Sequence, residues 1–185
     1  MKLPQLLMIL PDTSTLPPLS LPLGFALHNH TVGKDESAWE RIVEAAFGSH
    51  YGFDSFLVAA GGYAPENVLY ISRNGTDIAT TTAVENDRYP GFGWLRMVAT
   101  DPAAQGHHAG RLAVLAALQN LAARGYRQVL LSTDDKRLPA IALYRSLGFE
   151  PYYTDESHAA RWAAVNEALD AYRRKKNKHE THGNN

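Results

Sequence analysis

The sequence has 185 residues and no cysteine, which excludes several kinds of site. A disulfide framework, a cysteine nucleophile, a thiolate-bound zinc ion and an iron–sulfur cluster all need that residue. No apolar run approaches the roughly 18 residues of a membrane-spanning helix, so we expect no membrane association. A chain of this length can bury about two-thirds of its unfolded surface. We therefore expect one domain held by a hydrophobic core, and the missing cysteine fits a reducing, cytoplasmic location.

The sequence also lacks a strong net charge, which is −1 at pH 7. Five basic residues and one acid lie in residues 173–185, so the rest of the chain carries 13 basic and 18 acidic side chains. Because nucleic-acid-binding domains usually present a basic face, we do not expect nucleic acid as a partner. The basic run at residues 173–178 fits the C-terminal end of a helix, where cations are favourable; contact with RNA or acidic lipid is the alternative.

Proline is concentrated at the start of the chain, where five of the ten prolines fall within the first 22 residues. Proline has no backbone N–H, so we expect residues 1–23 to form an extended arm. The leucines of this arm would lie on the domain surface or on a partner subunit, which leaves a homodimer open. Met1–Leu10 is too short, and too interrupted by Pro4, for a secretory signal. The folded domain is expected over residues 24–174, and residues 175–185 as a disordered polar tail.

Strand and helix patterns fill the expected domain. Asn74-Gly75 predicts a hairpin between strands 67–73 and 76–85, because a type I′ turn needs positive φ at both central residues. Ser37 followed by Glu40 predicts a capping box for a helix that ends at Gly48. Other helices are expected at 109–124, 139–147 and from Ser157 onward, and other strands at 25–31, 94–100, 128–133 and 149–153. Hairpins followed by βαβ units predict an α/β fold with a mixed sheet.

The strongest functional signal lies between Thr100 and Arg111, where a strand ends, a loop of small residues follows and an Ala/Leu-rich helix begins. The first turn of a helix has unpaired N–H groups and favours an anion. Gly106 and Gly110 would let a phosphate approach the backbone closely. From the residues alone this loop is either a phosphate site or a solvated connection. It is neither a Walker loop nor a dinucleotide fingerprint.

Two motifs together resemble the GCN5-related N-acetyltransferase family. Residues 105–110 (Gln-Gly-His-His-Ala-Gly) are similar to its acetyl-CoA signature, Arg/Gln-x-x-Gly-x-Gly/Ala. Residues 140–149 (Ala-Ile-Ala-Leu-Tyr-Arg-Ser-Leu-Gly-Phe) are similar to its second motif, Ala-x-x-Leu-Tyr-x-x-x-Gly-Phe. The two motifs stand in the family's order and at its usual separation. Residues 133–140 are also similar to the mycothiol-synthase-like branch.

The resemblance implies a mostly antiparallel sheet with splayed central parallel strands, flanked by helices, and transfer of an acetyl group from acetyl-CoA to an amine of a small molecule or peptide. The backbone of residues 105–110 would bind the pyrophosphate, and strand 98–100 would pair with pantetheine and stabilise the oxyanion. Tyr144 would protonate the departing thiolate. The implied cofactor-binding residues are Val98, Ala99, Thr100, Gln105, Gly106, His107, His108, Ala109, Gly110, Arg111, Arg137 and Tyr144.

The sequence departs from the family pattern at two positions. His108 replaces the first motif glycine, and its side chain would either crowd the phosphate or bind it. Arg137 stands where the family often has Asn; it would pair with a CoA phosphate, cover the adenine or remain a surface charge. No base is obvious, and the candidates are Glu85 and, second, Asp87, each otherwise a solvated turn acid. The rival function is a non-catalytic module that binds acyl-CoA or a partner.

Other residues have simpler alternatives to a functional role. His28 and His30 share a strand face, but two polar strand residues explain them better than a metal pair, and we expect no metal. Asp134 and Asp135 follow a strand and would be site acids or helix caps.

Aromatic residues carry similar alternatives. Without the resemblance, Tyr144 would be a core residue on the inward stripe of its helix. Trp94 and Phe92 are candidates for the lining of an acceptor pocket, whereas Trp39 and Trp162 are expected in the core.

Overall fold

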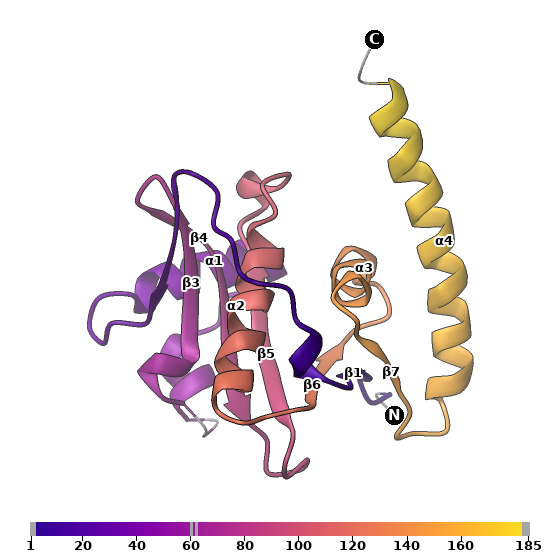
Figure 1. Ribbon diagram of the computed structural model, residues 1–185, viewed down its shortest axis with the longest axis horizontal. Helices are drawn as coiled ribbons and strands as arrows, with labels where there is room; N and C mark the ends of the chain where they lie inside the picture. Colours follow the sequence, from indigo (N-terminus) through magenta and orange to yellow (C-terminus); the bar gives the residue numbers. More distant parts are fainter. Residues whose placement is uncertain (1–2, 60, 62, 183–185) are drawn as a thin grey trace. The chain divides into compact units, whose positions relative to one another are not determined.

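The computed structural model describes residues 3–59, 61 and 63–182 (Figure 1). Contacts divide the chain into a larger unit, Pro11–Leu130, and a smaller unit made of Met1–Leu10 and Leu131–Asn185. Both units combine strands with helices, and most strand pairs are antiparallel, so the predicted mixed α/β fold is confirmed. Among the residues described, no helix is long and apolar enough to cross a bilayer.

The larger unit is built on four antiparallel strands in the order β2-β3-β4-β5. These are β2 (Phe25–Asn29), β3 (Val68–Arg73), β4 (Thr76–Glu85) and β5 (Gly93–Thr100). Between β3 and β4, Asn74 and Gly75 have φ angles of 50° and 82°, which confirms the predicted turn.

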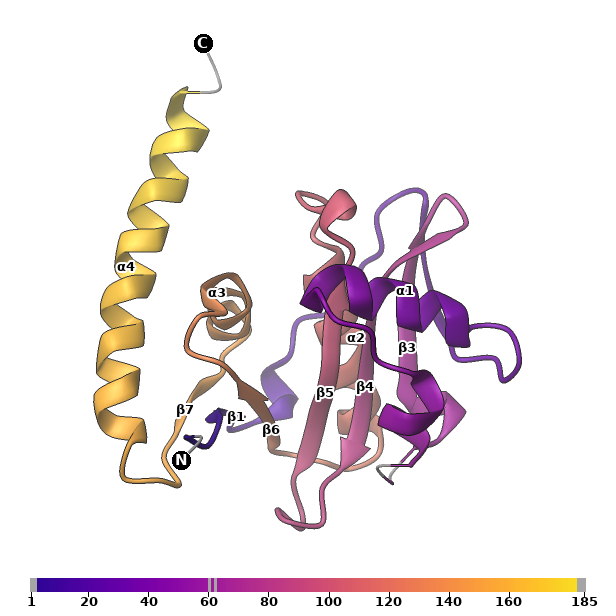
Figure 2. The same cartoon turned by 180° about the vertical axis from the view of Figure 1, so that it is seen from behind.

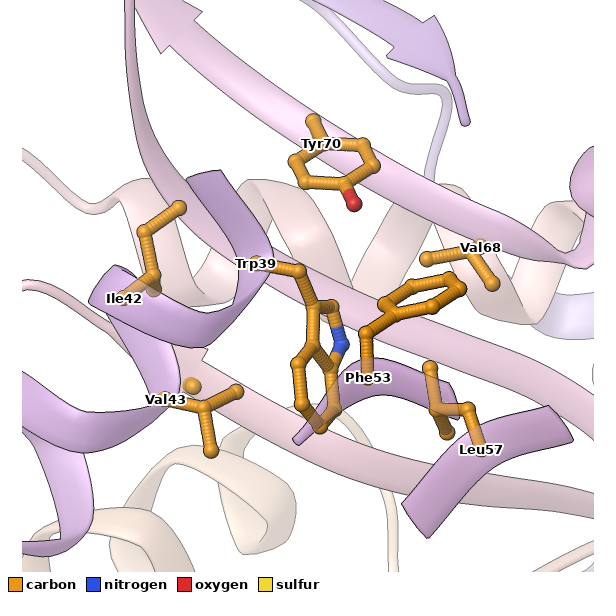
Figure 3. Close-up of a cluster of buried hydrophobic side chains, with 8 residues drawn as sticks. Trp39, Ile42, Val43, Phe53, Leu57, Val68 and Tyr70 are labelled. Carbon is orange, nitrogen blue, oxygen red and sulfur yellow. The ribbon is translucent and has the colours of Figure 1, made fainter. Parts of the chain in front are cut away.

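Helices α1 (Glu36–Phe47) and α2 (Ala109–Ala123) cover opposite faces of these strands, as the two views in Figures 1 and 2 show. On the α1 face, a π-helical turn at Asp54–Val58 completes a cluster in which Trp39 and Phe53 meet edge to face at 5.4 Å (Figure 3). On the α2 face, Leu112 and Ala113 pack against Ile71. Because both faces of the sheet are covered, packing determines which residues of β5 face α1 and which face α2.

The start of α1 differs from the prediction. The helix begins at Glu36, and the backbone preceding it is held by Asp35, whose carboxylate accepts from the Thr31 N–H at 2.8 Å. Glu40 does not complete a capping box with Ser37; its carboxylate accepts from the N–H of Phe53 at 2.8 Å. The prediction of a capping box was therefore wrong, because the Glu40 carboxylate binds a residue distant in sequence instead of the start of the helix.

The first residue of β5 lies beside the residue that precedes β6 (Val129–Thr133). The Gly93 N–H donates to the Gln128 carbonyl at 2.9 Å. A Cβ at Gly93 would stand only 3.0 Å from both methyl groups of Leu121, so this close approach needs glycine. Because both strands start at this point, the contact between Gly93 and Gln128 fits the parallel pair expected of β5 and β6. The splay of the two strands stays a prediction.

The smaller unit contains residues 131–133 of β6, strands β1 and β7, and helices α3 (Leu138–Ser146) and α4 (His158–His182); the strand order here is β6-β1-β7. Strand β1 (Leu6–Leu10) pairs antiparallel with β7 (Glu150–Tyr152), with Leu7 opposite Tyr152. Leu6 and Met8 are fully buried. The expectation of an extended arm was therefore wrong for β1, because its apolar run, free of proline, pairs with a strand about 140 residues away.

The rest of the expected arm lies in the larger unit, where Leu19 and Leu21 pack on the apolar cluster of the α2 face. At the other end of the chain, α4 buries Trp162, Val165 and Leu169 and continues to His182. The expected disordered tail is thus helical up to His182, and residues 183–185 lie outside the described residues. The boundaries proposed for the domain, 24 and 174, stay predictions.

Candidate active site

The loop that leads from β5 into α2 is fixed at its start by Asp101. The Asp101 N–H donates to the Ile78 carbonyl at 2.8 Å, and one carboxylate oxygen accepts from the Ala103 N–H at 2.9 Å. The other carboxylate oxygen accepts from Arg41 of α1 at 3.0 Å. A short 3-10 turn, Pro102–Ala104, follows. These contacts anchor the loop to the sheet and to α1, so the residues beyond it have a defined position.

The residues after this turn present backbone N–H groups without protein acceptors. The first hydrogen bond of α2 runs from the Leu112 N–H to the His108 carbonyl at 3.1 Å. Within the described part of the chain, no acceptor pairs with the N–H groups of residues 106–110. Gln105 differs from the expectation, because its N–H already donates to the Pro102 carbonyl at 3.2 Å. Five of the six expected backbone donors thus remain available to an anion at a helix start.

His108 has a left-handed backbone, with a φ of 58°, and caps α2 without a side-chain hydrogen bond. This conformation favours glycine, which is the residue that the family motif has at this position. The imidazoles of His107 and His108 are both exposed. The turn therefore forms despite the histidine, and the side chain is directed into an exposed position.

Strand β5 contains an irregularity that the sequence did not indicate. Thr80 faces Ala99 and Thr82 faces Arg96, so Met97 and Val98 together stand opposite Thr81. Met97 has a φ of 51°, the mark of a β-bulge. A bulge leaves backbone groups out of the ladder, and this one lies where an N–H near Val98 or Ala99 was expected to stabilise an oxyanion. In the residues described, the buried hydroxyl groups of Thr81 and Thr82 also have no partner.

A cavity of about 520 Å³ lies in the larger unit next to this strand. Its lining combines two acids, two arginines and polar or aromatic side chains: Gly61, Tyr63, Asn67, Val84, Glu85, Asn86, Asp87, Trp94, Arg96 and Arg124. The expectation that Trp94 lines a pocket agrees with this cavity, and the Trp94 ring stacks on Tyr89 at 5.5 Å. Phe92 is not part of the lining.

Glu85 ends β4 directly opposite Gly93. Its side chain is 65% exposed and lies 3.6 Å from the guanidinium of Arg124. A hydrogen bond with Glu85 raises the pKa of Tyr126. Glu85 is therefore an exposed acidic side chain that lines the cavity beside Arg124. Asp87 lines the same cavity.

In the smaller unit, Tyr144 lies on α3 and is buried against Phe149, with ring centroids 5.8 Å apart. Burial raises the pKa of Tyr144 to about 12, and the charge of Arg137 acts in the opposite direction. The phenol thus keeps its proton at neutral pH, which is the state that a proton donor needs. Arg137 itself pairs with Asp134 at 3.2 Å on the surface.

The remaining candidates have protein partners. His28 pairs with Asp77 at 2.8 Å, and His30 contacts the Tyr70 hydroxyl at 3.0 Å. Asp135 forms an ion pair with Arg161 rather than capping α3. Across the described ranges, no group of three or more acidic or histidine side chains is placed to hold a metal ion. These residues support the fold.

The model of the acetyltransferase (GNAT) family matches residues 36–149. The chain belongs to this family. The matched GNAT segment holds α1, the β3–β5 strands, the loop of unpaired N–H groups, and Tyr144. The resemblance seen in the two sequence motifs is confirmed at the level of the family.

Curated relatives of this GNAT chain include two proteins named mycothiol acetyltransferase. The one from Thermomonospora curvata is 33% identical over 150 residues, which cover 77% of this chain and 50% of the relative. The one from Nocardia farcinica is 32% identical over 170 residues, which cover 82% and 54%. The chain therefore spans about half the length of these relatives.

Solved structures agree on the fold. A GCN5-related N-acetyltransferase from Sphaerobacter thermophilus gives a TM-score of 0.67 at 26% identity, covering 80% of this chain and 48% of that one. The NatC complex bound to Gag peptide and CoA gives 0.59 at 16% identity, covering 71% and 87%. The second likeness shows the fold alone.

Seven of the ten cavity residues were not expected from the sequence, among them Tyr63, Arg96 and Arg124. Arg96 stands two residues after Trp94 and so presents the same face of β5, which is a signal that the strand pattern contains. Arg124 stands at the end of the helix predicted at 109–124, and Tyr63 lies in a segment without a regular pattern; only the folded chain brings both to the cavity.

Proposed function

We propose that this chain is an acetyl-CoA-dependent N-acetyltransferase that acts on an amine of a small molecule or peptide. The observation that carries the proposal is the set of five unpaired N–H groups at residues 106–110, which include the left-handed residues Gly106 and His108 at the start of α2. A diphosphate has the charge and the acceptor atoms that such a helix start favours. We propose that these groups hold the CoA pyrophosphate, with the Gln105 side chain and Arg111 beside them.

The reaction proposed is direct attack of the neutral amine on the thioester carbonyl. A C–N bond forms, the C–S bond breaks, and the sulfur leaves as a thiolate. Backbone N–H groups at the bulge of β5, near Val98 and Ala99, would stabilise the tetrahedral oxyanion. Glu85 would take the amine proton through water, and Tyr144 would give a proton to the thiolate. These roles are supported by the exposed carboxylate and by the protonated state of the buried phenol.

Other parts of the expectation stay proposals. We propose a cytoplasmic location, since the chain contains no cysteine. We also propose that Arg137 assists CoA binding only if its ion pair with Asp134 opens. The name of the curated relatives is no guide to the acceptor, because about half of each relative lies outside the match. A homodimer also remains a prediction.

The test is a pair of measurements on the full chain. Titration calorimetry is expected to show binding of acetyl-CoA, and release of the CoA thiol is expected when an amine panel is added. Binding without release from any amine would support the rival function, a non-catalytic acyl-CoA-binding module. Absence of binding would overturn both functions.

A further inference from the structure

The cavity contains one arginine whose charge has no acidic partner. Arg96 is half-buried, and its guanidinium donates to the Phe56 carbonyl at 2.9 Å and lies 5.3 Å from the centre of the Phe56 ring. Among the described residues, no carboxylate lies within ion-pair distance of it. Burial lowers the pKa of Arg96, so the position costs solvation that no charge on the chain offsets. A guanidinium has five N–H donors, and most of these remain available.

The second arginine of the cavity shows the contrast. Arg124 donates to the Ala83 carbonyl at 2.9 Å and to the Asn67 side chain at 3.1 Å, and it pairs with Glu85. Arg124 is thus occupied in holding the ends of β3 and β4 together. Arg96 lines the same cavity, and among the described residues the Phe56 carbonyl is the one acceptor that its guanidinium meets.

The position of Arg96 on β5 relates it to the proposed chemistry. Arg96 immediately precedes the bulge at Met97, whereas Glu85 faces Gly93, three residues back along the strand. Three residues of strand span about 10 Å. An anion bound at Arg96 would therefore lie at the bulge end of the cavity, with Trp94 and the acids farther along.

We infer that the acceptor carries a carboxylate next to its amine, as a free α-amino acid does, and that Arg96 binds this carboxylate. This inference rests on the proposed function and names its substrate class. A carboxylate matches the planar fork of a guanidinium, which binds it through two parallel hydrogen bonds. One carbon atom separates the two groups of an α-amino acid, so a carboxylate on Arg96 keeps the amine close to the bulge.

The charges of the whole lining fit the same class. The cavity has two arginines and two acids, Glu85 and Asp87, so a zwitterion meets both signs, whereas a polycation or a polyanion would meet repulsion from one pair. The stacked ring of Trp94 offers an apolar wall for a side chain. The N-terminal residue of a peptide has an amide in place of the carboxylate, so peptides would be poorer acceptors.

The experiment compares each acceptor with its decarboxylated counterpart, with release of the CoA thiol as the readout. Tyrosine is paired with tyramine, tryptophan with tryptamine and lysine with cadaverine, and the remaining protein amino acids are tested with their amides. At least one amino acid is expected to exceed its partner more than tenfold in kcat/KM. Transfer to the carboxylate-free amines alone, or with equal efficiency, would overturn the inference and leave the proposed function standing.

Variants assign the preference to a residue. R96Q is expected to raise KM for the preferred amino acid at least tenfold and to leave its carboxylate-free partner unchanged, and R96K is expected to recover part of the loss. R88Q removes the same charge from the loop between β4 and β5, outside the lining, and is expected to change neither KM. Equal effects of R96Q and R88Q would overturn the role of Arg96.

A binding measurement separates this inference from the proposed function. The Nε–H resonance of Arg96 is followed by NMR in the presence of CoA while the amino acid and its decarboxylated partner are added in turn. A shift with the amino acid alone supports the site even if no transfer occurs, whereas equal shifts or no shift would overturn it. Unchanged CoA affinity and thermal unfolding of R96Q would show that the variant is folded.

Discussion

At the scale of single residues, His108 has the clearest conflict between local preference and fold. A left-handed conformation costs a non-glycine residue about 1–2 kcal/mol, although histidine tolerates it better than most. We expect His108→Gly to raise the free energy of unfolding by up to about 1 kcal/mol, after the entropy cost of glycine, and to keep CoA affinity. Thermal unfolding measures this change as a rise of roughly 2–4 °C in Tm.

The adjacent histidine supplies the control for this prediction. His107 is also exposed and does not have a positive φ. His107→Gly gains nothing from relief of strain, so it is expected to leave stability unchanged or to lower it by about 1 kcal/mol. If both variants changed stability alike, the left-handed strain at His108 would not be the cause.

Tyr144 supplies a second prediction at this scale. Tyr144→Phe is expected to lower kcat at least tenfold and to leave acetyl-CoA affinity nearly intact, because the ring packing stays while the proton donor is lost. The pKa of Tyr144 in the folded chain, about 12, exceeds the usual 10. The stability that the neutral phenol contributes is therefore complete below pH 10 and is lost as the pH rises from 10 to 12. The wild-type chain should therefore lose more stability than the variant between these pH values in denaturant titrations. Loss of affinity and stability at neutral pH would show a packing role instead.

At the scale of elements, β1 is a structural part of the smaller unit rather than an arm. Met8 is fully buried in this strand, so Met8→Ala removes a core side chain and leaves a cavity. Such a change costs about 2–5 kcal/mol. Leu3, 60% exposed, supplies the control, and Leu3→Ala is expected to change stability by less than about 0.5 kcal/mol. Equal, small effects in urea titrations would contradict a buried β1.

The first turn of α4 depends on an ion pair. Arg161 bonds to Asp135 and also to the Pro4 carbonyl at 2.6 Å. The hydrogen bond with Arg161 lowers the pKa of Asp135 below 3.8, so its contribution is present above that pH and is lost as the pH falls through the lowered value. Asp135→Asn should remove this acid dependence and destabilise the smaller unit. Unfolding titrations from pH 5 to pH 2 test this, and an unchanged acid dependence would contradict it.

The same elements show what the sequence could and could not predict. The hairpin at Asn74-Gly75 and the stop of α1 at Gly48 depend on local backbone rules, and both were predicted. The pairing of β1 with β7 and the bulge at Met97 depend on partners distant in sequence, so no local pattern could indicate them. The same distinction applies to the candidate site. The loop at residues 105–110 is a local motif that the sequence could predict, whereas the cavity around Arg96 is assembled by folding.

At the scale of the whole molecule, family membership and coverage point to different conclusions. The GNAT match over residues 36–149 contains the loop, the bulge and Tyr144. The curated relatives are about twice as long as the part that this chain matches. The proposed acetyl-CoA site therefore rests on the backbone of this chain. The acceptor has to be inferred from the residues that line the cavity of this chain.

The central claim is that the backbone of residues 106–110 binds the diphosphate of CoA. The most direct measurement follows the amide resonances of a ¹⁵N-labelled chain while CoA or pantetheine, which lacks the diphosphate, is added. CoA is expected to shift the amide signals of these five residues more than any others, and pantetheine is expected to leave them in place. Shifts of equal size with both ligands, or the largest CoA-induced shifts elsewhere in the chain, would contradict it.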